Sequence, residues 1–304
     1  MSQQSTKTIN CHQIANNKIL IDLVKMLLSP KPQPGAIIRY IQHYKIDINS
    51  YLPNISDPEM FLPLIYYCVS TPDLVPLFEY LMQQGVRVDC TMITDRPEKQ
   101  IELLYYSQIA YIPTLVKGGA KINPQSFPNF GQKLLVKGNV NKIIVLYSAG
   151  AVTREALQQL LQTPGLIFRV LDQLYARAYQ MCQAKTDVRQ IDEIINNYIN
   201  VFKFFFKNGI NINQVESGEP FFQRVLNTYF VELIRVLVDY LNDVDNIDIL
   251  HYSNFDLTNR QVMSHFYNEA NFTAIENIVR HKLVPTKVTK RTLTLKKTIP
   301  IMDR

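Results

Sequence analysis

The sequence predicts an all-α protein built as a solenoid of short helical repeats, and three observations carry this prediction. A short amphipathic segment recurs along the chain, four of its copies end at a glycine, and two of its positions are apolar in every copy. The chain has 304 residues, of which 47% are hydrophobic. A repeat array can bury this many hydrophobic residues, because each added unit extends one continuous core.

The recurring segment is recognised by the residue that ends it, which we call the closing residue. The glycine-closed copies end at Gly85, Gly119, Gly150 and Gly209, and three further copies end at Lys45, Leu241 and Lys282. A helix often ends with a residue in the left-handed conformation, which glycine adopts without steric cost. Dipeptides such as Val88-Asp89, Ile122-Asn123 and Ile212-Asn213 follow, and they predict an extended exit with a polar turn residue.

The seven copies share apolar columns with helical spacing. The first column contains Ile38, Phe78, Ile112, Ile143, Phe202, Ile234 and Ile275, and the second, three residues later, contains Ile41, Leu81, Leu115, Leu146, Phe205, Leu237 and Ile278. A third column, three residues before the first, reads Gly35, Val75, Ile109, Val140, Ile199, Val231 and Phe272. Residues at i, i+3 and i+6 line one helical face, so all three columns are expected to face the core.

These segments resemble the second helix and the following loop of the ankyrin repeat. The resemblance is closest at 197–209 and 229–241, and 118–123 matches the closing portion. Leu62-Pro63-Leu64-Ile65 and Glu219-Pro220-Phe221-Phe222 resemble a reduced first-helix motif. The resemblance covers roughly residues 30–285. Consecutive closing residues are 31, 32, 34, 40, 41 and 59 residues apart, where an ankyrin repeat takes about 33.

The resemblance implies an ankyrin-like solenoid with five segments. They are a capping helix at 1–30, repeats at 31–153, an irregular helical insertion at 154–190, further repeats at 191–284, and an extended basic tail at 285–304. In the insertion, Ala156, Leu157, Leu160 and Leu161 predict one helix that stops at Pro164-Gly165, and residues 167–182 predict a second. Whether it forms an aberrant repeat or a hinge stays open.

The sequence offers little catalytic chemistry. It contains no dinucleotide-binding or phosphate-binding glycine motif, no nucleophile elbow, and no cysteine or histidine spacing typical of zinc. The acidic residues from Asp239 to Asp248 fail the calcium-loop pattern. The aromatic pairs at 66–67, 105–106 and 221–222 fit gap-filling between helices better than base stacking. We therefore expect no enzyme, no metal and no cofactor.

The charge distribution separates the tail from the rest of the chain. Of the net charge of +6, +5 lies in residues 285–304, which contain Lys287, Lys290, Arg291, Lys296, Lys297 and Arg304 against Asp303. A whole-surface nucleic-acid footprint is therefore not expected. No signal peptide or membrane span is visible, and no two cysteines are close in sequence. We expect free thiols, an intracellular and cytoplasmic location, and no membrane partner.

The expected function is protein binding through a concave face. In ankyrin arrays the loop tips and inner helices line that face, so the candidate partner-binding residues are Arg87, Asp89, Lys121, Asn123, Asn211, Asn213 and Asp245. Eroded repeats of this kind resemble those that large DNA viruses and intracellular bacteria direct at host proteins. The alternatives are a structural virion component, non-specific nucleic-acid binding through the tail, and a ubiquitin-ligase substrate adaptor. Homo-oligomers are compatible with each.

Overall fold

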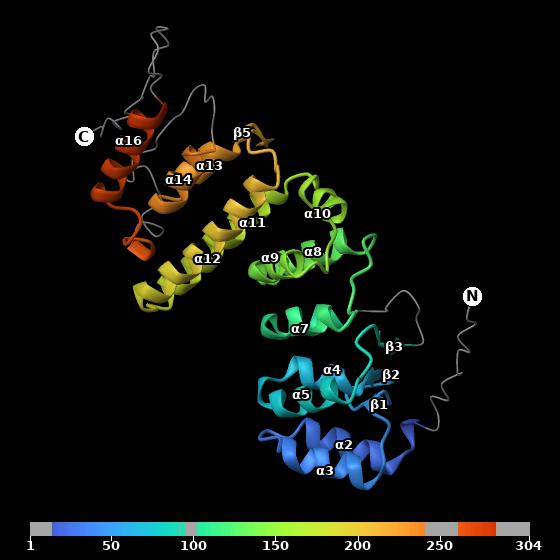
Figure 1. The fold of residues 1–304 in the computed structure, drawn as a ribbon. Coiled ribbons are helices and arrows are strands. Elements are labelled where there is room, and N and C mark those ends of the chain that lie inside the picture. The colour runs from blue at the N-terminus through green and yellow to red at the C-terminus, as the bar shows by residue number, and fades with distance from the viewer. Residues whose placement is uncertain (1–13, 91, 95–101, 241–260, 284–304) are drawn as a thin grey trace. The chain divides into compact units, whose positions relative to one another are not determined.

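The structure is a computed structural model that describes residues 14–90, 92–94, 102–240 and 261–283. These residues are mostly helical with little sheet (Figure 1), so the all-α character is confirmed. Among them, no helix is both long enough and apolar enough to cross a membrane. Asp245, Leu241 and the five lysine and arginine positions predicted for the tail lie outside the described residues.

The chain divides into two compact units. Unit 1 comprises residues 1–127 and 145–153, and unit 2 comprises residues 128–144 and 154–304. The elements before residue 120 are α2 (Lys18–Leu27), α3 (Pro34–His43), β1 (Tyr51–Asn54), β2 (Asp57–Pro63), α4 (Leu64–Ser70), η1 (Pro72–Leu74), α5 (Val75–Gln83), β3 (Ile93–Thr94), α6 (Leu103–Tyr106), η3 (Ile109–Tyr111) and α7 (Ile112–Lys117).

The remaining elements are mostly longer helices. They are α8 (Phe127–Val136), α9 (Val140–Ser148), α10 (Arg154–Leu161), α11 (Leu166–Gln183), α12 (Val188–Lys207), β4 (Val215–Glu216), β5 (Glu219–Pro220), α13 (Phe221–Leu226), α14 (Val231–Val238) and α16 (Glu269–Leu283). Within unit 2, α11 packs on α12 and on α13, α13 packs on α14, and α14 packs on both α12 and α16.

Five predicted closing residues adopt the left-handed conformation. The φ angles are +48° at Lys45, +77° at Gly85, +102° at Gly119, +82° at Gly150 and +85° at Gly209. Each turn has the same two backbone hydrogen bonds. At Gly85, for example, the Gly85 N–H donates to the Met82 carbonyl at 3.1 Å and the Val86 N–H to the Leu81 carbonyl at 3.0 Å. These two hydrogen bonds satisfy carbonyls that a helix end leaves unpaired.

The prediction that Lys282 is a closing residue is wrong. Helix α16 continues through it to Leu283, and no glycine stands there to favour a left-handed turn. A further turn of the same kind, which the sequence did not predict, lies at Lys185 between α11 and α12, with φ +55°. Helix α12 also begins at Val188, nine residues before the segment that the sequence predicted from Asn197.

The first two apolar columns face the core almost throughout. In the first column every member is buried except the half-buried Ile38, and in the second every member is buried except the half-buried Ile278. The third column does not behave as predicted. Val140, Ile199 and Phe272 are buried, but Val75 is 40% exposed, Ile109 is 42% exposed and Gly35 is exposed. Its burial depends on what packs beside each helix, which the column spacing does not encode.

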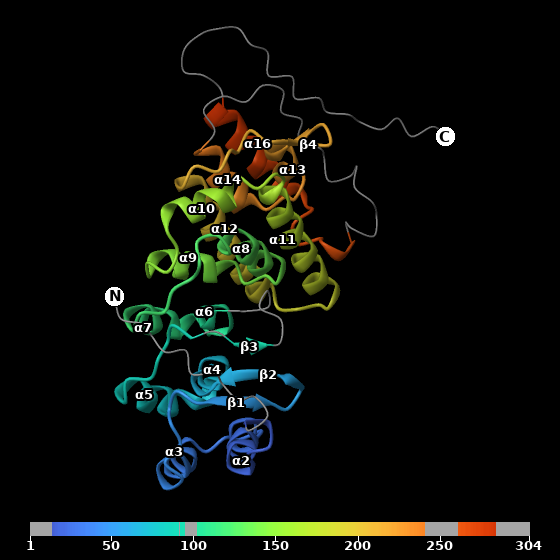
Figure 2. The same cartoon turned by 90° about the vertical axis from the view of Figure 1, so that its right-hand side faces the viewer.

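Short strands connect the helices, which the all-α prediction did not include. In unit 1, β1 pairs antiparallel with β2, and β2 with β3, so that Leu52 opposes Leu62. These strands lie on the other side of α4 from α5 and α7 (Figures 1 and 2). In unit 2, β4 and β5 form a small antiparallel hairpin. Each hairpin leads directly into a helix, at Pro63 before α4 and Pro220 before α13, where ψ is 145° and 144°.

The region 154–190 contains the two helices that the sequence predicts, α10 and α11. Residues 162–165 separate them, and Gly165 has φ +65°. Helix α10 packs closely on α8, since a Cβ atom on Gly131 would lie 2.6 Å from Cδ2 of Leu160. Glycine in this helix interior therefore allows a close approach, and an alanine there would require the Leu160 side chain to move.

Candidate functional site

The finger loops are the candidate site, and we define them as the five residues after each of Lys45, Gly85, Gly119 and Gly209. They are 46–50, 86–90, 120–124 and 210–214. In each loop the first and third residues are buried or half-buried, whereas the second and fourth are polar and exposed. The residues after Gly150 do not share this pattern, because Ala151 and Val152 are both buried. The exposed polar positions are Asp47, Asn49, Arg87, Asp89, Lys121, Asn123, Asn211 and Asn213. This alternation directs one set of side chains inward and presents the other to solvent.

Three of the predicted residues lie close together in unit 1. Arg87 Nε lies 3.4 Å from Asp89 Oδ1, with both side chains more than 60% exposed. Asp89 and Lys121, from successive loops, line one small pocket of ≈ 80 Å³ together with Cys90 and Glu102. Two acidic and two basic groups therefore meet within one stretch of surface.

Backbone contacts to side chains fix the shape of these loops. The Arg87 N–H donates to Asn49 Oδ1 at 2.8 Å, which ties one finger loop to the preceding one. The Asn123 N–H donates to Glu102 Oε1 at 3.3 Å, and Ser126 Oγ donates to the same oxygen at 2.9 Å. Sequence analysis did not single out Asn49 or Glu102. Asn49 has a signal in the sequence, because it occupies the same loop position as Asp89, Asn123 and Asn213.

The third predicted pair belongs to unit 2. Asn211 Oδ1 accepts the Asn213 N–H at 2.9 Å, and in unit 1 Asp47 Oδ1 accepts the Asn49 N–H at the same distance. Asparagine and aspartate favour this local turn because their short side chains reach the backbone two residues ahead. Much of the role of Asn211 is therefore to shape its loop, whereas the side chain of Asn213 is exposed to solvent.

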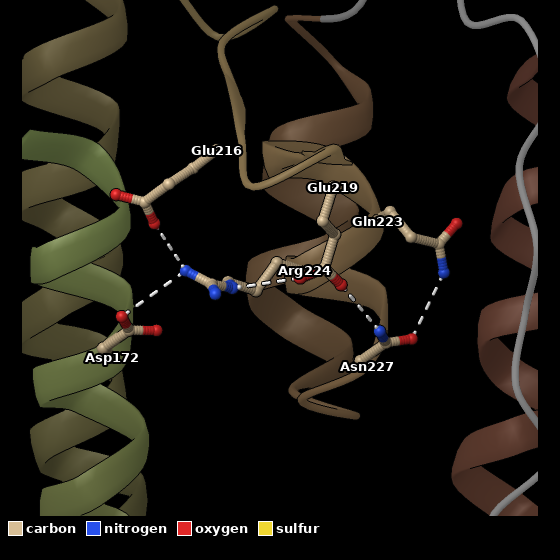
Figure 3. A network of polar contacts seen from close by, with 6 residues as sticks. All are labelled: Asp172, Glu216, Glu219, Gln223, Arg224 and Asn227. Carbon is tan, nitrogen blue, oxygen red and sulfur yellow. Dashed lines mark hydrogen bonds and ion pairs between the residues drawn. The ribbon is translucent and has the colours of Figure 1, made fainter. Parts of the chain in front are cut away.

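An ion network around Arg224 holds the unit 2 hairpin against the helices beneath it (Figure 3). Arg224 on α13 reaches Glu216 on β4 at 2.8 Å, Glu219 on β5 at 3.1 Å and Asp172 on α11 at 3.5 Å. Asn227 Nδ2 donates to the other oxygen of Glu219 at 3.1 Å. The Arg224 guanidinium also lies 5.2 Å from the centre of the Phe168 ring. Sequence spacing did not reveal this network, because its members come from four separate elements.

The charges of this network influence one another. Burial raises the pKa of Asp172 above its usual value, Arg224 opposes that shift, and the neighbouring Glu216 and Glu219 add to it. The same carboxylates raise the pKa of Arg224 despite its partial burial. The guanidinium therefore stays charged and links the hairpin, which follows the finger loop 210–214, to α11, so we assign the network a role in positioning the hairpin.

The described residues include few other groups that could bind a metal or take part in a reaction. Among them, no group of three or more histidine, cysteine or acidic side chains could hold a metal ion. Cys68, Cys90 and Cys182 are free thiols, and burial raises the pKa of the Cys90 thiol to about 11. Lys142 on α9 is the exceptional group, since it is only 5% exposed and burial lowers its pKa to about 8.

The aromatic pairs mostly fill space between helices. Phe221 and Phe222 are buried, and Phe221 lies 5.4 Å from Phe168 in an edge-on arrangement. Tyr67 is buried as well, but Tyr66, Tyr105 and Tyr106 are half-buried, with ring centres 4.8 Å apart between Tyr66 and Tyr106. These three tyrosines lie on helices α4 and α6 of unit 1.

The fold and site define a mostly helical protein with polar finger loops on short hairpins and turns. Comparisons with protein-family models, with curated proteins and with solved structures found no match for this chain. The functional argument therefore rests on the residues described above.

Proposed function

We propose that the chain is an ankyrin-like repeat protein that binds another protein through its finger loops and has no catalytic activity of its own. The single observation that carries this proposal is the recurrence of the closing turn. The same left-handed residue with the same two hydrogen bonds precedes each finger loop, from Lys45 to Gly209. Units built on one repeated turn are typical of arrays whose extended surface binds a partner.

The chemistry of the finger loops favours a protein partner over a nucleic acid. Arg87 and Lys121 are offset by Asp89 and Glu102 within the same surface. Nucleic-acid binding depends on basic side chains that neutralise phosphates, and an evenly mixed surface does not supply this. Mixed charge gives specificity for a complementary protein surface. The tail remains the predicted location of any nucleic-acid binding.

Affinity purification with a combined variant tests the proposal. Tagged full-length protein carrying Arg87→Ala, Asp89→Ala and Lys121→Ala is purified from expressing cells beside the wild type. We expect stoichiometric partners seen with the wild type to be depleted at least about tenfold with the variant, because several rim contacts are removed together. Quantitative mass spectrometry of the co-purified proteins measures the depletion.

The control variant carries the same three residue types at exposed positions of unit 1 outside the finger loops. It is Arg39→Ala, Asp73→Ala and Lys117→Ala, and all three side chains are exposed. Retention of the partner by this control and loss by the finger-loop variant supports the proposal. Equal retention by both variants, with unchanged circular dichroism, contradicts it.

A further inference from the structure

An apolar groove opens on unit 1 between α5 and the segment formed by η3 and α7. Its volume is ≈ 640 Å³, and its lining includes Val75, Phe78, Glu79, Met82 and Tyr111. The volume falls in the range of roughly 300–1,000 Å³ that is usual for ligand pockets. None of its lining residues belongs to a finger loop. Helices α5 and α7, which contribute to its lining, lie on the other side of α4 from β1 and β2 (Figures 1 and 2).

The groove exposes an apolar side chain at a position that equivalent helices bury. Val75, which lines the groove, belongs to the third apolar column and is 40% exposed, whereas Val140 and Ile199 in that column are 3% and 4% exposed. Nothing within the described residues covers Val75 to the same extent. Contiguous exposed apolar surface with a polar rim is typical of an interaction site.

The floor of the groove is aromatic and deformable. Phe78 and Tyr111 are 4% and 7% exposed, and their ring centres lie 4.6 Å apart at an angle of 46°. The half-buried Met82 extends this floor. Aromatic rings supply large contact area, and the flexible thioether of methionine adapts to irregular partners. An aliphatic side chain therefore suits this floor.

The rim carries one charge. Glu79 is exposed, it is the only charged residue that lines the groove, and it forms no ion pair with the described residues. The other polar lining residues, Gln83, Gln108 and Thr114, are neutral. A carboxylate at the edge of an apolar groove selects a basic side chain, and it disfavours an acidic one by repulsion.

We propose that this groove binds an amphipathic segment of a partner protein, with an aliphatic side chain against Phe78 and Tyr111 and a neighbouring lysine or arginine paired with Glu79. Laying the apolar face of a helix into such a groove is a recurring mode of peptide recognition. The site is independent of the finger loops, so a partner can occupy one surface without the other. Its test can therefore fail while the finger-loop proposal stands.

The probe is a fluorescein-labelled amphipathic helical peptide with leucines on one face and flanking lysines, titrated with the full-length protein and followed by fluorescence polarisation. A second peptide has glutamates in place of the lysines. We expect the wild type to bind the lysine peptide more tightly than the glutamate peptide. Val75→Asp is expected to weaken binding about tenfold, because the aspartate replaces apolar contact. Glu79→Lys is expected to reverse the preference between the two peptides.

Two controls keep the outcomes separate. Val188→Asp replaces a valine of the same 40% exposure on α12, outside the groove, and is expected to leave binding unchanged. Equal affinity for both peptides in the wild type, or no effect of Val75→Asp, overturns the proposal. Self-association of the unliganded wild type that Val75→Asp abolishes, measured by light scattering, also overturns it, because a second copy would then occupy the groove.

Discussion

Helices α12 and α9 follow the same repeat pattern but differ at one inward position. Both place apolar residues in the first two columns, and both end at a left-handed glycine, Gly209 and Gly150. Directly before the first column, α12 has Val201, which is fully buried, whereas α9 has Lys142, which is 5% exposed. The position is therefore buried whether its residue is apolar or basic.

The difference between Val201 and Lys142 shows that the repeat pattern controls the burial of this position but not its residue type. Leu77 and Leu233, which also precede the first column, are fully buried as well. The packing of neighbouring helices sets the burial of this position, and the residue type then determines how much stability results. A buried ammonium group loses hydration, and this loss lowers the pKa of Lys142 to about 8. Mutations in the apolar columns and closing turns should change the stability of both helices alike, whereas mutations at the position of Val201 and Lys142 should not.

The largest expected effect concerns the shared first column. Phe202→Ala in α12 should lower the free energy of unfolding by about 3–5 kcal/mol, because it removes a fully buried ring beside Phe206 and Phe221. Ile143→Ala in α9 should lower it by about 2–5 kcal/mol. Urea denaturation measures both, and the exposed neighbour Lys203→Ala should stay within about 0.5 kcal/mol of the wild type. A loss below about 1 kcal/mol for Phe202→Ala would show that α12 is not packed as described.

The next effect concerns the position at which the helices differ. Lys142→Met should raise the free energy of unfolding at pH 7 by about 1–3 kcal/mol, because it replaces a buried amine of depressed pKa with an apolar side chain of similar length. The matched change Val201→Met should instead be neutral or destabilising by less than about 1.5 kcal/mol. Urea denaturation of both variants checks the contrast. If Lys142→Met is clearly destabilising, the ammonium group is held by interactions stronger than its desolvation.

The same lysine predicts a pH dependence. The pKa of Lys142 is lowered from 10.5 to about 8 in the folded chain. Between these values the unfolded chain binds more protons than the folded one, so the stability contribution of this residue rises with pH. The gap between Lys142→Met and the wild type should be complete below pH 8 and should shrink as the pH approaches 10.5. A gap that stays constant over this range would mean that Lys142 titrates normally.

Local features of the fold were predictable from the sequence, and long-range ones were not. The closing turns at Gly85, Gly119 and Gly209 follow from glycine chemistry, and the two main columns follow from helical spacing. The hairpin strands, the early start of α12 at Val188 and the exposure of Val75 depend on neighbouring elements. Spacing along one helix carries no information about them.

The candidate site shows the same division. Six of the exposed finger-loop residues were predicted because each follows a closing residue by a fixed interval, as Asp89 follows Gly85, whereas Asp47 and Asn49 of the first loop were not. The ion network of Arg224 was not predicted, since it joins α13 to Asp172, which lies 52 residues earlier on α11. Contacts of this kind depend on how helices are packed, and a single sequence does not reveal their pairing.

The smallest expected effect concerns the turn that both helices share. Gly150→Ala and Gly209→Ala should each lower the free energy of unfolding by about 1–2 kcal/mol, because alanine at φ +82° or +85° is strained although its Cβ meets no atom within 4 Å. Lys45→Gly should act in the opposite direction, by less than about 1 kcal/mol, since Lys45 already bears this strain at φ +48°. Urea denaturation of the three variants measures the effects. Similar losses of unfolding free energy at both glycines would show that α9 and α12 end in the same turn. A loss at only one of them would show that the two helices share the apolar columns but not the turn.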